Sequence, residues 1–229
     1  MLGASLDALV HVEAVLAVEA DAVTDNPLVF PEDAEVISGG NFHRQPVALA
    51  LDSLSVAAAE IASLSERRLF RLLYNDIEGL PRCLARRPGV ESGLMMVQYL
   101  AAALVSENRT LGHPASLDNV VTGGGMEDHN SMGSIAAARL PRLLRNVRGV
   151  LAGELLAAAE ALEYHAPLRP ARGTAAGLEA VRAVVPRLSG DRALAPDIEA
   201  LANPAALAAV VRAAETAIGA PLRGLGVTT

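Results

Sequence analysis

Apolar residues recur every three or four positions along most of the chain, which is the spacing of one face of an α-helix. An alternation of polar and apolar residues, which marks a half-buried strand, never persists, and only a short extended piece is predicted at Glu35–Ile37. The predicted fold class is therefore all-α, a bundle of long helices in a single helical domain over residues 1–229. The predicted helices cover Leu2–Ala22, Pro46–Tyr74, Leu94–Leu111, a stretch from near Glu127 to Leu162, Thr174–Leu188 and Pro204–Ile218.

The helix predicted from Pro46 to Tyr74 carries a narrow apolar seam. Its residues follow a spacing of four, three, four and three positions: Val47, Leu51, Leu54, Ala58 and Ile61. Proline suits the first helical turn, because its missing N–H would have no partner there. A helix of about 29 residues is about 43 Å long, so we expect it to pack against partner helices from this chain or from other subunits.

Proline and glycine mark the ends of the predicted helices. Thr24–Pro27 ends the first one, since a residue before proline is pushed out of the helical region. Pro141 lies within the second long helix and predicts a kink or a break. Asn203 is a natural N-cap before Pro204, and Gly219 is a natural stop.

Composition narrows the function classes. The chain is 52% hydrophobic but only 3% aromatic, so its core is expected to consist of alanine, leucine and valine. The net charge of −7 argues against a nucleic-acid partner, which would require a basic face. A single cysteine, Cys83, excludes a disulfide framework and a cysteine-based zinc site. The longest uncharged run, Ser92–Ser106, is short for a membrane span, and no signal peptide is recognised, so we predict a cytoplasmic protein without a membrane partner.

The stretch Thr122–Gly133 contains the clearest candidate chemistry. Its three consecutive glycines mark a bend, because glycine inside a helix is entropically costly. Glu127, Asp128 and His129 follow, at the expected start of the second long helix. A carboxylate and an imidazole at a rigid corner form a candidate site, but acidic residues in a first helical turn also complement the helix dipole. The residues alone leave both interpretations open, and their spacing matches no zinc motif, so no metal site is predicted.

Several motifs, in this order along the chain, resemble the histidine and aromatic amino-acid ammonia-lyase family. They are TDNPLVF at Thr24–Phe30, ISGGNFH at Ile37–His43, IASLSERR at Ile61–Arg68, AALVSEN at Ala102–Asn108, His113-Pro114, EDHNSMG at Glu127–Gly133 and LAPDIE at Leu194–Glu199. Glu-Asp-His at residues 127–129 resembles the histidine ammonia-lyases more than the phenylalanine enzymes. The motifs cover nearly the whole chain, which resembles the C-terminal portion of such an enzyme.

The resemblance implies a helical homotetramer that removes ammonia from an α-amino acid and leaves an α,β-unsaturated acid. The family's electrophile is methylidene-imidazolone, formed from an internal Ala-Ser-Gly in the N-terminal half, and its active sites are assembled from several subunits. By position, Glu127 is the candidate catalytic residue, and Phe42 and Asn26 are candidate substrate-binding residues. Their chemistry suits these roles: a desolvated carboxylate holds or moves a proton, a phenyl ring packs on a planar side chain, and an amide orients a substrate without titrating.

The chain departs from the family pattern at three points. It contains no Ala-Ser-Gly, so the electrophile cannot form from this polypeptide. The family's tyrosine base and its Tyr-x-x-Arg carboxylate clamp would lie upstream of Met1. Arg44 stands where the family has a small residue, and Gly125-Met126 replaces the usual Asn-Gln, which weakens the case for histidine as the substrate.

The leading hypothesis is the C-terminal part of an ammonia-lyase-like enzyme, inactive alone, that acts on a small amino acid. It would form a homo-oligomer, a tetramer in the family, or a complex with an N-terminal half that carries methylidene-imidazolone. The alternative is a non-catalytic helical assembly module or remnant. A third hypothesis, an unrelated helical small-molecule binder, leaves the ordered motifs unexplained. The residues leave open which amino acid is used and whether lyase or aminomutase chemistry follows.

Overall fold

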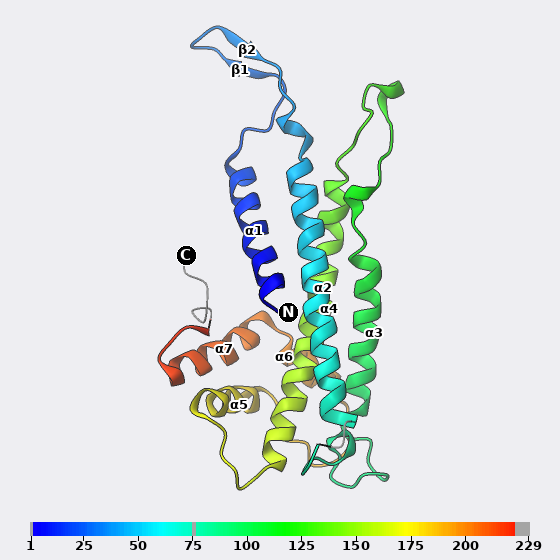
Figure 1. Cartoon of the computed structure of the whole chain (residues 1–229), viewed down its shortest axis with the longest axis vertical. Coiled ribbons are helices and arrows are strands. Elements are labelled where there is room, and N and C mark those ends of the chain that lie inside the picture. The colour runs from blue at the N-terminus through cyan, green and yellow to red at the C-terminus, as the bar shows by residue number, and fades with distance from the viewer. Residues whose placement is uncertain (1, 75–76, 223–229) are drawn as a thin grey trace. The chain divides into compact units, whose positions relative to one another are not determined.

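The computed structural model describes residues 2–74 and 77–222, and within them it confirms the predicted all-α class (Figure 1). The helices are α1 (Leu2–Asp21), α2 (Gln45–Tyr74), α3 (Met95–Leu111), α4 (Gly133–Tyr164), α5 (Arg172–Val184), α6 (Ala195–Leu201) and α7 (Pro204–Ile218). Strands β1 (Leu28–Phe30) and β2 (Glu35–Ile37) form one antiparallel hairpin. The chain divides into two compact units, a first of Met1–Ile61 and Asn108–Leu144 and a second of Ala62–Glu107 and Arg145–Thr229.

Most helix boundaries lie close to the predicted ones. Helices α2, α3 and α7 begin and end within one residue of the predicted positions. The predicted ends of α7 are also confirmed, since Ala205 N donates a hydrogen bond to Asn203 Oδ1 at 2.9 Å and Gly219 adopts a left-handed φ of +73°. The short extended piece predicted at Glu35–Ile37 is β2, whereas β1 and α6 are not predicted from the sequence.

The start of α4 differs from the prediction. The helix begins at Gly133 rather than near Glu127. Thr122 N donates to the Glu127 carbonyl at 3.0 Å and Glu127 N donates to the Thr122 carbonyl at 3.3 Å, so the backbone there is paired as a short bridge. Met132, directly before the helix, has a left-handed φ of +55°, which a helix cannot continue through. The interpretation of Glu127 and Asp128 as first-turn helical residues is therefore wrong.

Pro141 lies inside α4 without ending it, so the predicted break does not occur. Proline removes one backbone hydrogen bond from the helix, and its ring here is exposed. The neighbouring apolar face is packed: Leu140 lies against the core of the first unit and Leu143 is fully buried. Tertiary packing of this kind supplies most of the stability of a protein helix.

The first unit has a small core formed by residues of α2, α4 and the turn at residues 115–117. Leu51, Ala115 and Ala136 are buried together in this core. Helices α1 and α2 lie side by side (Figure 1), and Ser5 Oγ donates a hydrogen bond to Glu60 at 2.6 Å. Asp52 on α2 is buried and accepts a hydrogen bond from the backbone N of the turn at residues 115–117, at 2.8 Å. These contacts attach the loops that lead to α4 to the long helix α2.

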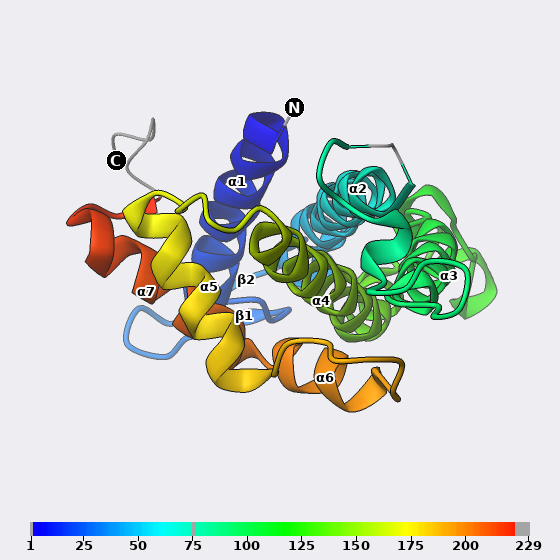
Figure 2. The same cartoon turned by 90° about the horizontal axis from the view of Figure 1, so that it is seen from below.

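The second unit packs α5 against α7, beside the C-terminal part of α4 (Figure 2). Side chains of these three helices line an apolar pocket of about 460 Å³. The lining residues are almost all alanine, leucine, valine and glycine, as the composition predicts for a helical core poor in aromatic residues.

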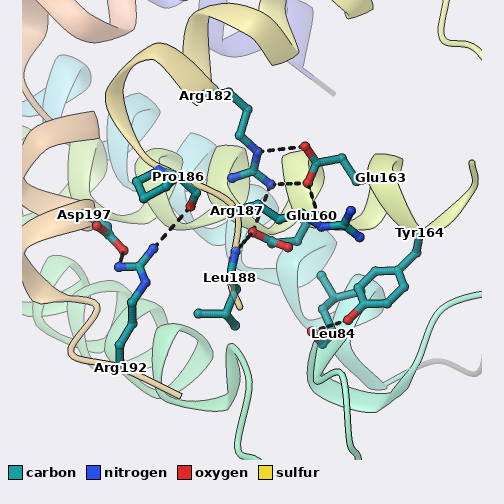
Figure 3. Close-up of polar contacts among 10 residues, drawn as sticks. All are labelled: Leu84, Glu160, Glu163, Tyr164, Arg182, Pro186, Arg187, Leu188, Arg192 and Asp197. Carbon is teal, nitrogen blue, oxygen red and sulfur yellow. Dashed lines mark hydrogen bonds and ion pairs between the residues drawn. The ribbon is translucent and has the colours of Figure 1, made fainter. Parts of the chain in front are cut away.

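A buried ion-pair network connects α4, α5 and the segment after α5 (Figure 3). Glu160 on α4 is only 1% exposed, and it accepts hydrogen bonds from Arg182 Nη2 at 2.9 Å and from Leu188 N at 2.8 Å. Arg182 also donates to Glu163 at 2.7 Å, and Arg187 Nε lies 3.3 Å from the same carboxylate. Since a buried carboxylate must have its charge compensated, these contacts hold the segment after α5 against α4.

Helix α2 is long and apolar enough to cross a membrane by length and composition alone. Among the described residues, an apolar window of 18 residues within Asn41–Tyr74 has a mean hydropathy of 1.6, and 44% of that window is buried inside the protein. The same helix carries the buried acidic residues Asp52 and Glu66, and Gln98 Nε2 donates a hydrogen bond to Glu66 at 3.0 Å. Buried carboxylates bonded to protein groups are features of a core helix.

Candidate functional site

The glycine-containing stretch Thr122–Gly133 and the motif at Ile37–His43 meet at one pocket of the first unit. The pocket has a volume of about 740 Å³, within the range of small-molecule sites. Phe42, His43 and Arg44 line it from the short turn before α2. The opposite wall is formed by Val120, Thr122 and residues 130–134 at the start of α4. The pocket is therefore built from segments that lie far apart in the sequence.

A tight glycine turn presents the candidate carboxylate. Gly123, Gly124 and Gly125 all have positive φ, at +59°, +66° and +96°, and only glycine adopts this conformation without strain. The turn brings Thr122 opposite Glu127, and Thr122 Oγ1 donates a hydrogen bond to Glu127 Oε2. Within the described part of the chain, Glu127 Oε1 has no hydrogen-bond donor. One carboxylate oxygen is therefore held in place, and the other remains able to accept a proton or an N–H.

Two asparagine side chains connect the two sides of this loop, residues 119–120 and residues 128–130. Asn130 N donates to Asn119 Oδ1 at 2.8 Å, and Asn119 Nδ2 donates to the Asp128 carbonyl at 2.7 Å. Asn130 Nδ2 also donates to the Val120 carbonyl. Because both amides bond to backbone groups, they set the path of the chain on either side of the Glu127 turn.

A histidine pair joins this loop to the turn before α2. The ring of His43 stacks on that of His129, with an angle of 6° between the ring planes. His43 Nε2 also lies 2.8 Å from the backbone carbonyl of His129, so this nitrogen carries the proton and donates. The contact places the segment of Phe42 beside the segment of Glu127.

The three site residues predicted from the sequence occupy different places. Phe42 lines the pocket and is 48% exposed. Glu127 bonds to Thr122, which lines the pocket, and is itself exposed. Asn26 lies outside the pocket lining at the base of the hairpin, where its Oδ1 accepts hydrogen bonds from Ser38 Oγ at 3.0 Å and Gly39 N at 3.2 Å. The structure thus brings Phe42 close to the Glu127 loop and leaves Asn26 at the hairpin.

Sequence reasoning missed the residues that hold the site together. The sequence analysis singles out neither Asn119 nor Asn130, and it does not predict the contact between His43 and His129. The signal for the asparagines was their position on either side of a glycine run, where side-chain amides commonly bond to backbone. Arg44, one of the departures from the family pattern, lines the pocket.

The described residues offer no metal centre. Within residues 2–74 and 77–222, no three His, Cys, Asp or Glu side chains gather as a metal-binding group. The arrangement suits binding and acid–base chemistry: one exposed aromatic ring and one cation line a small hollow, and a carboxylate with a free oxygen is bonded to Thr122 in its wall.

Comparison with known proteins gives a consistent result. A family model described as aromatic amino acid lyase matches residues 1–183. A histidine ammonia-lyase from Symbiobacterium thermophilum is 55% identical over 217 residues, which cover 95% of this chain and 43% of that protein. A histidine ammonia-lyase from Deinococcus radiodurans is 49% identical over 224 residues, 96% of this chain and 43% of that protein.

Solved structures are also similar. Histidine ammonia-lyase from Trypanosoma cruzi matches with a TM-score of 0.90 and 36% identity, over 99% of this chain and 46% of that one. Tyrosine aminomutase from Streptomyces globisporus matches with a TM-score of 0.87 and 40% identity, over 94% of this chain and 41% of that one. The chain thus spans less than half the length of the relatives it matches.

Proposed function

Because the chain belongs to the aromatic amino acid lyase family, we propose that it forms part of a carbon–nitrogen lyase that removes ammonia from an α-amino acid. The product is an α,β-unsaturated acid. The observation that supports this most directly is that the motifs at 37–43 and 127–133 meet at one pocket through the stacked pair His43 and His129. Histidine is the candidate substrate by the names of the relatives, and Arg44 and Met126 are the departures that argue against it.

Glu127 is the proposed catalytic residue. Its Oε2 is held by Thr122, so Oε1 accepts an N–H of the substrate or holds the proton that is moved during elimination. Phe42 packs its exposed ring on a planar substrate side chain. Asn26 has its Oδ1 occupied by Ser38 and Gly39 and keeps its Nδ2 as a donor toward substrate.

Methylidene-imidazolone supplies the electrophile that makes the amine of the substrate a leaving group in this family. The serines that line the pocket do not fit as its precursor, because Ser131 lies between Asn130 and Met132 and Ser134 lies between Gly133 and Ile135. We therefore propose that the group is supplied by another polypeptide segment, and that the 229-residue chain is inactive alone.

We further propose that the chain works in an oligomer, either as a homotetramer or together with an N-terminal half. We also propose that it functions as a single helical domain and that it is located in the cytoplasm. Exposed apolar side chains on the first unit support a partner surface. Leu49 and Val56 on α2 are each 52% exposed, and Leu117 is 73% exposed. The three line one groove of about 460 Å³, which a further helix could cover.

A second candidate function is a non-catalytic assembly module. It is favoured by one observation, the lack of Ala-Ser-Gly anywhere in the chain. Such a module would bind the same partner without contributing to turnover.

Complementation tests the proposal. The purified chain would be assayed alone and after co-expression with the N-terminal part of the Symbiobacterium thermophilum histidine ammonia-lyase, with the ultraviolet absorbance of urocanate or cinnamate as the readout. We expect no product from either part alone and product from the pair. Glu127→Gln should abolish most of that activity, whereas Glu179→Gln, at an exposed position on α5, should leave it unchanged. Product from the chain alone would refute the electrophile assignment, and a stable complex without product would support the assembly module.

A further inference from the structure

Thr122 connects the pocket to the candidate carboxylate. Thr122 is one of the described residues that line the pocket, whereas Glu127 is not. The two residues are paired through their backbones, by hydrogen bonds of 3.0 and 3.3 Å that run in opposite directions. The Glu127 side chain lies back over the turn, since a Cβ on Gly123 would lie 3.5 Å from its Cδ and Oε2 atoms. The carboxylate is thus joined to the pocket wall through the Thr122 hydroxyl.

The hydrogen bond between these two side chains sets the polarity of the Thr122 hydroxyl. A hydroxyl has one proton to donate and two lone pairs that accept. An ionised carboxylate only accepts, so the Thr122 proton is committed to Glu127 Oε2. No other described residue exchanges a hydrogen bond with Thr122 Oγ1. Toward a molecule in the pocket, this oxygen is therefore left as an acceptor.

The serine hydroxyls of the wall lack such a partner. Ser134 Oγ makes no hydrogen bond with a described residue, and Ser131 Oγ accepts only a long one from Gly133 N, at 3.5 Å. Both serines can rotate their protons to suit either a donor or an acceptor on a ligand. Among the described hydroxyls that line the pocket, Thr122 is therefore the one whose polarity the protein fixes.

The remainder of the wall is suited to a small planar molecule. Phe42, Val47 and Met132 offer apolar surface, and the volume is about 740 Å³. Hydrogen bonds in a chain polarise one another, so donation to an anionic carboxylate makes Thr122 Oγ1 a better acceptor. The pocket thus fits a planar apolar body that carries an N–H or O–H group.

We propose that Thr122 is a specificity-determining residue of this pocket, whose hydroxyl oxygen accepts an N–H or O–H of the bound molecule while its own proton is donated to Glu127. The inference rests on the proposed function in taking this pocket as the binding site. It adds a contact on Thr122, through which Glu127 Oε2 acts, to the one proposed for Glu127 Oε1.

Calorimetric titration of the full 229-residue chain with indole and with benzofuran tests the proposal. The two molecules have nearly the same shape, but indole carries an N–H where benzofuran carries an oxygen. We expect the chain to bind indole about fivefold more tightly, the value of one neutral hydrogen bond. Thr122→Val lacks the hydroxyl and should abolish this preference, whereas Thr122→Ser should keep it. Thr110→Val, at an exposed position on α3, is the matched control and should leave the preference unchanged.

Glu127→Gln separates control of the hydroxyl from a purely structural role. A glutamine amide donates as well as accepts, so this change releases the Thr122 proton for an acceptor on the ligand. We expect the preference for indole to fall to the level of Thr122→Val, and to fall no further when the two changes are combined. Additive losses, which would make the double variant prefer benzofuran, would contradict the proposal.

Equal affinities of the original chain for indole and benzofuran would overturn the proposal, as would an unchanged preference in Thr122→Val or no indole binding at millimolar concentration. The result is independent of turnover. If the complementation assay gives no product but the preference for indole depends on Thr122, only the proposed activity fails. If product forms and the preference is absent, only this inference fails.

Discussion

The imidazole of His43 stacks on that of His129 with the ring centroids 5.3 Å apart, and it hydrogen-bonds the backbone of the same residue. This pair connects two segments 86 positions apart in the sequence. It is the direct link between the turn that carries Phe42 and the loop that carries Glu127.

Removal of the His43 ring should loosen the Glu127 loop. A stacked ring and one hydrogen bond together stabilise the contact by about 1–2 kcal/mol, so His43→Ala should speed amide hydrogen exchange across residues 122–130 roughly tenfold. His43→Phe keeps the ring and should have a smaller effect. His113→Ala, at an exposed position in the same unit, is the control. Unchanged exchange in His43→Ala would show that the loop is held by its own contacts alone.

Arg44→Gly should stabilise the chain. The left-handed backbone at this position costs an arginine about 1 kcal/mol and costs glycine little. We expect a higher melting temperature, by about 2–4 °C for a chain of this size. The measurement is thermal unfolding followed by circular dichroism, and a lower melting temperature would contradict the assignment of strain.

Glu160→Gln should destabilise the second unit by about 1–3 kcal/mol, because it weakens the charge-assisted bonds to Arg182 and Leu188 N, although Arg182 keeps its pair with Glu163. Urea unfolding measures the loss. Glu179→Gln changes an exposed carboxylate on α5 and should stay within about 0.5 kcal/mol of the original chain. Similar values for the two variants would show that the network contributes little to the free energy of unfolding.

Gly93→Ala should be strongly destabilising. Gly93 has φ +55°, and a Cβ there would lie 2.4 Å from the Cys83 carbonyl oxygen. The same turn is held by Gly93 N, which donates to Asp191 Oδ1 at 2.9 Å. We expect a loss of about 2–4 kcal/mol from backbone strain and overpacking. Gly190→Ala, where a Cβ would meet no atom within 4 Å, should change the free energy of unfolding by less than about 0.5 kcal/mol.

The raised pKa of Tyr74 predicts that the chain loses stability in strong alkali. Burial, followed by its hydrogen bond with Cys83, raises the pKa of Tyr74 to about 12. The folded chain therefore holds this proton more tightly than the unfolded chain, whose tyrosine pKa is about 10. The stabilisation from Tyr74 is complete below about pH 10 and is lost as the pH rises toward about 12. Tyr74→Phe should reduce the slope of the free energy of unfolding against pH between about pH 10 and 12. Tyr99→Phe, at an exposed position, should leave that slope unchanged.

The long helices could be predicted from the sequence because their pattern repeats many times. The seam at Val47, Leu51 and Ala58 places α2 correctly to within one residue. The N-cap at Asn203 and the left-handed Gly219 likewise mark the two ends of α7. Local chemistry decides these elements, and local chemistry is visible in the sequence.

The candidate site could be predicted only in part. The residue types at Phe42 and Glu127 were recognisable, but the helical setting assumed for Glu127 was wrong, because the pairing of Thr122 with Glu127 takes the segment out of α4. The contact of His43 with His129 depends on how distant segments meet, and no local pattern reports it. The roles of Asn26, Phe42 and Glu127 toward substrate stay predictions.

The side-chain contacts that hold the Glu127 loop lie outside the glycine turn, whose own contacts are backbone hydrogen bonds from Gly125 N to the Thr122 carbonyl at 3.0 Å and from Met126 N to the Gly123 carbonyl at 3.4 Å. Asn119, Asn130 and the Thr122–Glu127 bridge hold the two arms, while a Cβ on Gly124 or Gly125 would meet no atom within 4 Å. The tip therefore has room for added atoms on its outer side. A short epitope or a fluorescent label grafted between Gly124 and Gly125 would break the two backbone hydrogen bonds of the turn and keep the bridge and the two asparagines that set the register of the arms.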